Sequence, residues 1–302
     1  AIKYYEESLA IKEKLGQEEG DVATSLNNIG GVYHSLGKYD KAIKNFKEAL
    51  AIDKRLGQEA DVAIRLNNIG MVYNSWGQYD KAIKHFKEAL AIAEKLGQEG
   101  SVATCLNNIG DVYHSLGKYD KALEYYEESL AIKKKLGQEE GDVATSLNNI
   151  GAVYHSLGKY DKAIKNFKEV LAIYKKLELE GRAAVGLNNI GFVYHDWGQY
   201  DKALKYYKEA LAIDKRLGQE AGVAVGLNNI GKVYSDWGQY DKALKYYEEA
   251  LAIDKRLGEE ADIGLSLNNI GGVYDDWGQS DKAIKYYEEA LAIARKLGME
   301  AD

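Results

Sequence analysis

An eight-residue block, Leu-Asn-Asn-Ile-Gly-x-Val-Tyr, recurs seven times along the chain. Its copies begin at Leu26, Leu66, Leu106, Leu147, Leu187, Leu227 and Leu267. Successive copies are 40 residues apart, except for one interval of 41. A fixed period of this length is the signature of stacked-repeat proteins, in which each repeat contacts only its neighbours. We therefore expect function to lie on a surface that the repeats share, instead of in one deep active site.

Each repeat predicts a pair of helices. In the repeat at 21–57, Leu26, Ile29 and Tyr33 recur at helical spacing, and a second apolar pattern follows from about residue 39 to 56. The same pair is expected at 61–97, 101–137, 142–177, 182–218, 222–258 and 262–298. Residues 1–16 match a second helix without its partner, so fifteen helices are expected in one array over 1–302.

Glycine and aspartate mark the boundaries within each repeat. Gly37 is the expected left-handed residue that ends the first helix, and Asp21 is its expected N-cap. Gly30 lies inside that helix although glycine costs ~1 kcal/mol there relative to alanine, so we expect the two helices to approach closely at this point. Before the fifth repeat Glu178 replaces the glycine and Arg182 replaces the aspartate, which predicts a weak junction with fast amide exchange.

The composition narrows the classes of function. The net charge is -7 with both signs interspersed, which argues against the basic stripe of a nucleic-acid-binding surface. Cys105 is the single cysteine, so neither an internal disulfide nor a cysteine-based zinc site is expected. No apolar run reaches the ~18 residues of a membrane span. The chain opens in mid-pattern and shows no signal peptide, so we interpret it as a fragment and expect a cytoplasmic location.

The repeat resembles the tetratricopeptide repeat. The residues that carry the resemblance are Leu26, Ile29, Gly30, Tyr33, Gly37, Tyr39, Ala42, Phe46 and Ala49. The resemblance implies an all-α fold, a right-handed α-α superhelix or solenoid. The usual unit has 34 residues and a proline after its second helix, whereas this chain has no proline and a longer period. In this it is similar to the repeats of kinesin light chains and spindle-orientation adaptors, which implies an extended peptide bound in a concave groove and no catalysis by the repeats.

The first helix of each repeat has two distinct sides. At 100° per residue, Thr24, Asn27, Asn28, Gly31, His34 and Ser35 lie opposite the apolar side. The tetratricopeptide resemblance implies that this opposite side lines the groove. The most diverse position of the repeat lies on it and is occupied by Gly31, Met71, Asp111, Ala152, Phe192, Lys232 and Gly272. Different side chains at this position predict pockets of different character along a bound peptide.

The paired asparagines do not vary among the repeats. Asparagine is a mediocre helix former, so a pair in mid-helix needs a reason. One interpretation is that the second asparagine offers a donor and an acceptor to the main chain of a ligand. These residues are Asn28, Asn68, Asn108, Asn149, Asn189, Asn229 and Asn269. The alternative is that the amides link adjacent first helices within the solenoid.

The charge at the end of the groove face changes along the array. Early repeats carry histidine or asparagine followed by serine, as at His155-Ser156, whereas later repeats carry acids at Asp196, Asp236 and Asp276. With His195, these residues predict an acidic end that favours a basic segment of a partner. The alternative is a solvated helix end.

Signals for catalysis are poor. The histidines occur once per repeat, without the spacing or carboxylate support of a metal site. Tyrosine pairs such as Tyr125-Tyr126 are expected to pack with a hydrated hydroxyl, and the four tryptophans are expected to cover the turns between helices. We therefore predict a non-catalytic protein-interaction scaffold without cofactor or metal, which binds neither nucleic acid nor membrane. The alternative is a self-associating array that stacks end to end, either engineered or a trimmed fragment.

Overall fold

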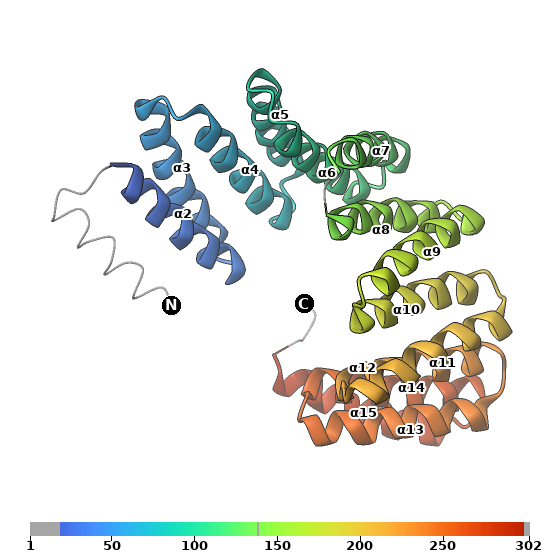
Figure 1. Ribbon diagram of the computed structural model, residues 1–302. Coiled ribbons are helices and arrows are strands. Elements are labelled where there is room, and N and C mark those ends of the chain that lie inside the picture. The colour runs from blue at the N-terminus through green and yellow to red at the C-terminus, as the bar shows by residue number, and fades with distance from the viewer. Residues whose placement is uncertain (1–18, 138, 299–302) are drawn as a thin grey trace. The chain divides into compact units, whose positions relative to one another are not determined.

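The computed structural model describes residues 19–137 and 139–298, and all regular structure in these ranges is α-helical (Figure 1). The helices are α2 (Glu19–Ser35), α3 (Tyr39–Leu56), α4 (Glu59–Ser75), α5 (Tyr79–Lys95), α6 (Glu99–Ser115), α7 (Tyr119–Lys135), α8 (Glu140–Ser156), α9 (Tyr160–Lys176), α10 (Glu180–Asp196), α11 (Tyr200–Leu217), α12 (Glu220–Asp236), α13 (Tyr240–Leu257), α14 (Glu260–Asp276) and α15 (Ser280–Lys296). The expected helix at 1–16 lies outside the described residues. The fold class is therefore an all-α helical-repeat solenoid, as the sequence predicts.

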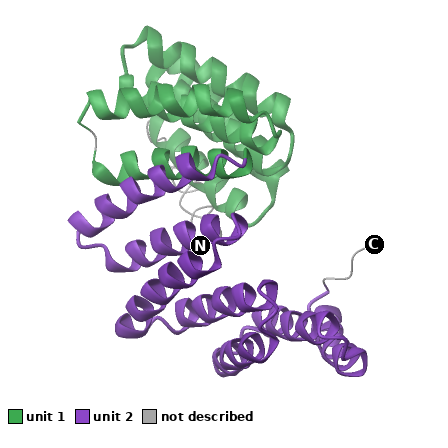
Figure 2. Cartoon of the chain, turned by 90° about the vertical axis from the view of Figure 1, so that its right-hand side faces the viewer, with its two compact units in different colours: residues 1–157 green, residues 158–302 purple. Residues whose placement is uncertain are grey.

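The chain divides into two compact units, residues 1–157 and 158–302 (Figure 2). Unit 1 contains α2 to α8 and unit 2 contains α9 to α15. Within each unit every helix packs against the next one along the chain. In unit 1 the first helices α2, α4, α6 and α8 also contact one another in succession. The even-numbered helices of unit 1 therefore form one continuous layer, and their outward sides form one continuous surface.

The glycine inside each first helix marks the closest contact between the paired helices. A Cβ atom built on Gly30 would lie 2.9 Å from the Phe46 ring, and one on Gly70 would lie 2.6 Å from the Phe86 ring. Both rings are buried. The expected close approach is confirmed, because the aromatic ring of the second helix occupies the space that a side chain at the glycine would need.

The first helix of each repeat ends as the sequence predicts but begins earlier. Gly37 has a φ of 68°, so it adopts the left-handed conformation expected after a helix. The N-cap prediction is wrong, because Asp21 lies in the first turn of α2, which already includes Glu19. At α4 the N-cap is Gln58, whose side chain makes no capping hydrogen bond. An aspartate in the first turn still interacts favourably with the helix dipole.

Glu178 occupies a conformation that glycine occupies at the other helix ends. Its φ is 56°, and among the described residues no other non-glycine residue has a positive φ. Arg182, which replaces the usual aspartate, lies over the Tyr174 ring at 6.0 Å from the ring centroid. This junction therefore carries local backbone strain, because a side chain in the left-handed region costs roughly 1–2 kcal/mol.

We predict that Glu178→Gly stabilises the protein by about 1 kcal/mol, because it relieves this strain. Hydrogen exchange followed by mass spectrometry should show slower amide exchange over residues 177–184, a region we expect to exchange fastest apart from the chain ends. The reciprocal control is Gly218→Glu, since Gly218 has a φ of 67° after α11. If exchange at 177–184 is unchanged in Glu178→Gly, the strain at this junction is not what limits its stability.

A buried ion pair joins the first two repeats. Arg65 Nε of α4 donates to Asp53 Oδ2 of α3 at 2.9 Å, and the two side chains are 8% and 1% exposed. Burial raises the pKa of Asp53, while the neighbouring Arg65 guanidinium acts in the opposite direction. The ion pair therefore links the two repeats through two charged side chains that are almost fully buried.

The equivalent positions of the other junctions carry different side chains. At the next junction Ala93 and Cys105 stand in place of Asp53 and Arg65, and both are buried. Between the third and fourth repeats Lys133 Nζ donates to Ser146 Oγ at 2.9 Å. The three junctions between the repeats of unit 1 thus differ in the side chains at these two positions, although the surrounding sequence is nearly identical.

Candidate groove on the first helices

The variable position of the first helices is solvent-facing where the side chain is large. Met71 on α4 is 42% exposed and Phe192 on α10 is 49% exposed. Lys232 on α12 is also exposed. Large apolar side chains left in water on an ordered helix are candidates for contact with a partner.

A surface cavity lies over this face in unit 1. Its volume is about 490 Å³, and it is formed mainly by α2 and α4. The residues that line it are Asn27, Asn28, Gly31, Val32, His34, Ser35, Phe46, Asn68 and Met71. Five of the six α2 residues assigned to the groove side by helical periodicity are among them. The structure therefore brings these residues together around one hollow.

The asparagines of unit 1 form a hydrogen-bonded ladder between successive first helices. Asn68 Nδ2 donates to Asn27 Oδ1 at 2.8 Å, and Asn108 Nδ2 donates to Asn67 Oδ1 at 2.8 Å. Within the described residues, the carbonyl oxygens of Asn68 and Asn108 accept no hydrogen bond. The amide donor of the second asparagine thus links successive first helices at these two positions.

In unit 2 the first asparagine makes a different contact. Asn228 Nδ2 donates to Ser266 Oγ at 3.4 Å. Asn188 Oδ1 is buried and has no hydrogen-bond partner among the described residues. The invariant pair therefore has different surroundings along the chain, although its sequence never changes.

Asp111 is held by neighbouring side chains at the variable position of α6. Tyr126 donates its hydroxyl proton to Asp111 Oδ1 at 2.5 Å, Asn149 Nδ2 donates to the same oxygen at 3.3 Å, and Asn107 Nδ2 donates to Oδ2 at 3.3 Å. Burial raises the pKa of Asp111. The expectation of a hydrated hydroxyl is wrong for Tyr126, because this tyrosine is buried and bonded to the carboxylate.

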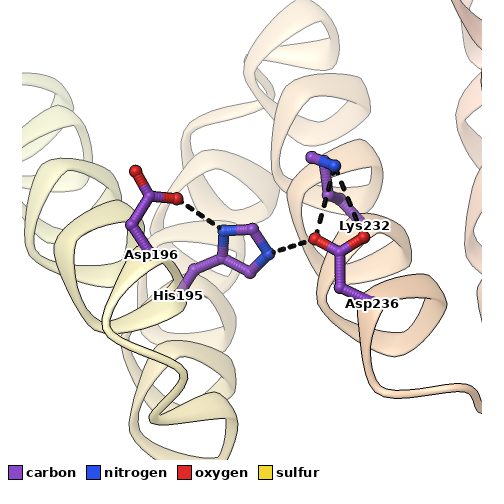
Figure 3. Close-up of polar contacts among 4 residues, drawn as sticks. All are labelled: His195, Asp196, Lys232 and Asp236. Carbon is purple, nitrogen blue, oxygen red and sulfur yellow. Dashed lines mark hydrogen bonds and ion pairs between the residues drawn. The ribbon is translucent and has the colours of Figure 1, made fainter.

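A polar cluster joins the last turns of α10 and α12 in unit 2 (Figure 3). His195 Nε2 lies 2.7 Å from Asp236 Oδ2, and His195 Nδ1 lies 3.1 Å from Asp196 Oδ1. Lys232 Nζ lies 3.3 Å from Asp236 Oδ2. At the equivalent place in unit 1, His34 Nε2 contacts Ser75 Oγ at 2.8 Å. The change from serine to aspartate therefore replaces a neutral contact by a charged one.

The remaining predicted groove residues lie on the same helices. Asn28 on α2 is exposed, and Asp276 is exposed at the end of α14. The residues that are half-buried are Asn149 and His155 on α8, Asn189 on α10, Asn229 on α12 and Asn269 on α14. Each is placed on the solvent side of a first helix.

Helical periodicity places Thr24 on this face, but sequence reasoning missed that its position, seven residues before the variable one, also varies among the repeats. This position carries Thr24, Ile64, Thr104, Thr145, Val185, Val225 and Leu265, all exposed. Residues seven apart lie on the same side of a helix, two turns away. The signal was present in the sequence, because this position also changes between polar and apolar residues.

The described residues contain neither a cluster of metal-ligating side chains nor a membrane-spanning helix. No group of three or more histidine, cysteine, aspartate or glutamate side chains in residues 19–137 and 139–298 is arranged to hold a metal ion. In the same ranges, no helix is long and apolar enough to cross a membrane.

The family of the chain follows from its repeats. The tetratricopeptide repeat family model matches residues 1–55, 58–135, 142–216, 182–256 and 222–296. These segments cover well over half of the sequence, so the chain belongs to the tetratricopeptide repeat family. No curated protein matches the chain significantly.

Solved structures with the same fold include three of different origin. BtubC (BKLC) from P. vanneervenii is 26% identical with a TM-score of 0.62, over 74% of this chain and 94% of that one. A putative kinesin light chain from Podosopora anserina, with nearly identical TPR-like repeats, is 20% identical with a TM-score of 0.56, over 68% and 97%. A Rap protein complexed with Competence and Sporulation Factor is 19% identical with a TM-score of 0.59, over 99% and 86%. The last two likenesses concern the fold alone.

Proposed function

We propose that this chain is a non-catalytic scaffold that binds an extended peptide segment of another protein along the groove face, the solvent side of its first helices. The observation that carries the proposal is the cavity of about 490 Å³ over α2 and α4, together with exposed apolar side chains on the same face. A similar fold, that of a Rap protein, is solved in complex with Competence and Sporulation Factor. Variable side chains above an invariant asparagine pair would give each repeat its own preference for a peptide residue.

The asparagine ladder suits this role because it leaves one group unused. The donors of Asn68 and Asn108 hold the stack together. Their carbonyl oxygens would then accept hydrogen bonds from the backbone N–H groups of a bound segment. The acidic end of unit 2 would favour a basic stretch of that segment, which makes binding sensitive to salt.

We predict that exposed groove side chains determine affinity. Peptides selected from a random displayed library would be measured by calorimetry on the whole chain and on Val185→Ala with Phe192→Ala. These side chains lie on one face of α10, and their removal is expected to weaken a ligand of unit 2 at least tenfold, about 1.4 kcal/mol. Lys232→Ala removes the cation paired with Asp236 and is expected to strengthen the binding of basic peptides. The matched change Lys205→Ala, at an exposed lysine of α11, is expected to leave it unchanged.

The same binding measurement also tests the role of the asparagines. Asn149→Ala with Asn189→Ala is expected to weaken the same peptides while helicity is retained. Lower stability with unchanged affinity would leave the asparagines with a purely structural role. Peptides that bind but respond to none of these changes would place the ligand on another surface.

The second candidate is end-to-end self-association. Ile284, Tyr287 and Leu291 on α15 are exposed, whereas their counterparts on α11 (Leu204, Tyr207 and Leu211) are buried by the following helix. Sedimentation over a range of protein concentrations separates the two candidates. Growth into long species that Leu291→Glu prevents would favour association over a simple scaffold.

A further inference from the structure

Three successive repeats of unit 2 share an exposed aspartate–tryptophan dipeptide. We call these pairs, Asp196-Trp197, Asp236-Trp237 and Asp276-Trp277, the Asp–Trp strip. The same positions in other repeats carry Ser35-Leu36, Ser75-Trp76, Ser115-Leu116 and Ser156-Leu157. Both residues are thus changed together in three neighbouring repeats, which indicates a surface with one chemical character.

Each tryptophan of the strip is fixed in place by the preceding repeat. The Trp197 ring lies against Tyr160 with centroids 5.7 Å apart, and Trp237 and Trp277 lie at the same distance from Tyr200 and Tyr240. The expectation that tryptophan covers a turn is therefore refined, because the ring also links two repeats. The three indoles are nonetheless 37%, 40% and 38% exposed. They are rigid aromatic surfaces in contact with water.

The charge around the strip is negative. Asp196 and Asp236 are bridged by His195, and Lys232 is the cation paired with Asp236. At the end of α14, Asp275 and Asp276 are adjacent, and no cation within the described residues pairs with them. The carboxylates of Asp275 and Asp276 are therefore available to pair with a basic partner.

The chain itself uses cations on aromatic rings, but not on these tryptophans. Lys202, Lys242 and Lys282 lie over Tyr194, Tyr234 and Tyr274 at 5.3, 5.2 and 5.0 Å from the ring centroids. No cation stands over Trp197, Trp237 or Trp277 among the described residues. Indole is the strongest cation–π acceptor of the aromatic side chains, and a guanidinium is the cation most often found on it. The exposed part of each indole is therefore suited to arginine, although the Trp197 ring also stacks on Tyr194 with the ring centroids 6.3 Å apart.

We propose that the Asp–Trp strip binds a basic segment of another protein in which arginines recur at every third residue. The ends of α10 and α12 lie within side-chain reach of each other, since His195 Nε2 is 2.7 Å from Asp236 Oδ2, and an extended chain advances about 10 Å over three residues. Each guanidinium then stacks on one indole and pairs with the aspartate next to it, because its planar fork suits both contacts. The proposal rests on the proposed function and deepens it by naming the partner chemistry of unit 2. Phosphate-bearing ligands are disfavoured by the carboxylates.

The test uses two fluorescent ten-residue peptides of the same composition. One has arginine at positions 2, 5 and 8 among serine and glutamine residues, and the other has its three arginines adjacent. Anisotropy with the whole chain at low salt is expected to show at least tenfold tighter binding of the spaced peptide. Trp197→Leu with Trp237→Leu and Trp277→Leu is expected to abolish this preference. Leucine occupies the same position in other repeats, so the variant should keep its helicity by circular dichroism.

The chain also provides a matched control in Trp76. This tryptophan stacks on Tyr39 but follows Ser75 instead of an aspartate, so Trp76→Leu should leave the affinity for the spaced peptide unchanged. Equal affinities of the two peptides, or of the wild-type chain and the triple variant, would overturn the inference. Neither result touches the proposed function, which depends on library-selected peptides and on Val185 and Phe192. If no peptide of the displayed library binds the chain, the proposed function is wrong, independently of this inference.

Discussion

Arg65→Ala is expected to destabilise the protein by about 3 kcal/mol, because it leaves the buried Asp53 carboxylate without its partner. Urea unfolding followed by helical circular dichroism measures the loss. The next junction shows a pair of side chains without charge at the same two positions, because Ala93 and Cys105 replace Asp53 and Arg65 there. The double variant Asp53→Ala with Arg65→Cys is therefore expected to recover most of the stability. An Arg65→Ala variant as stable as the wild type would show that Asp53 is already hydrated.

The same single variant should depend on pH in a defined direction. Burial already raises the pKa of Asp53, and removal of Arg65 takes away an influence that lowers it. A carboxyl group whose pKa is higher in the folded than in the unfolded state binds more protons when folded, so stability falls as pH rises above the unfolded value of about 3.9. The deficit of Arg65→Ala relative to the wild type should therefore be smaller near pH 4 than at pH 7. A deficit independent of pH would point to lost packing instead of an unpaired charge.

Gly30→Ala is expected to destabilise the protein, whereas Gly31→Ala one position later is expected to stabilise it. A Cβ on Gly30 would lie 2.9 Å from the Phe46 ring, but a Cβ on Gly31 would meet nothing within 4 Å. Overpacking costs about 1–3 kcal/mol, and alanine gains up to ~1 kcal/mol over glycine in a helix. Since both variants have the same gain in helix propensity, the difference between them in urea unfolding, about 2 kcal/mol, measures the steric conflict alone. Equal stabilities would mean that Phe46 moves aside without cost.

The helices and their endings were predictable because they depend on local patterns. Apolar spacing predicts the paired helices, and the recurrent glycine predicts both the left-handed ending at Gly37 and the close approach at Gly30. The start of the first helix of each repeat was not predictable, because an aspartate such as Asp21 is favourable both as an N-cap and in the first turn. Periodicity cannot separate these two positions when they lie only a few residues apart.

The residues of the groove face were predictable, but the hydrogen bonds among them were not. Helical angles place Asn28, Asn68 and Met71 on one surface, and one cavity lies over all three. Which amide donates to which depends on how adjacent repeats are stacked, so the hydrogen bond from Asn68 to Asn27 could not be predicted from the periodicity of a single helix. The same holds for Asp111, whose bond to Tyr126 crosses between two helices.

The different side-chain pairs at the junctions have a consequence for how such a chain can change in length. Near-identical repeats invite deletion by recombination, which would join the first repeat directly to the third. Asp53 would then face Cys105 and lose the arginine that neutralises it. A shortened array would thus carry a buried carboxylate without its guanidinium at the new seam, so the order of the first three repeats matters for stability in a way that the repeated consensus does not reveal.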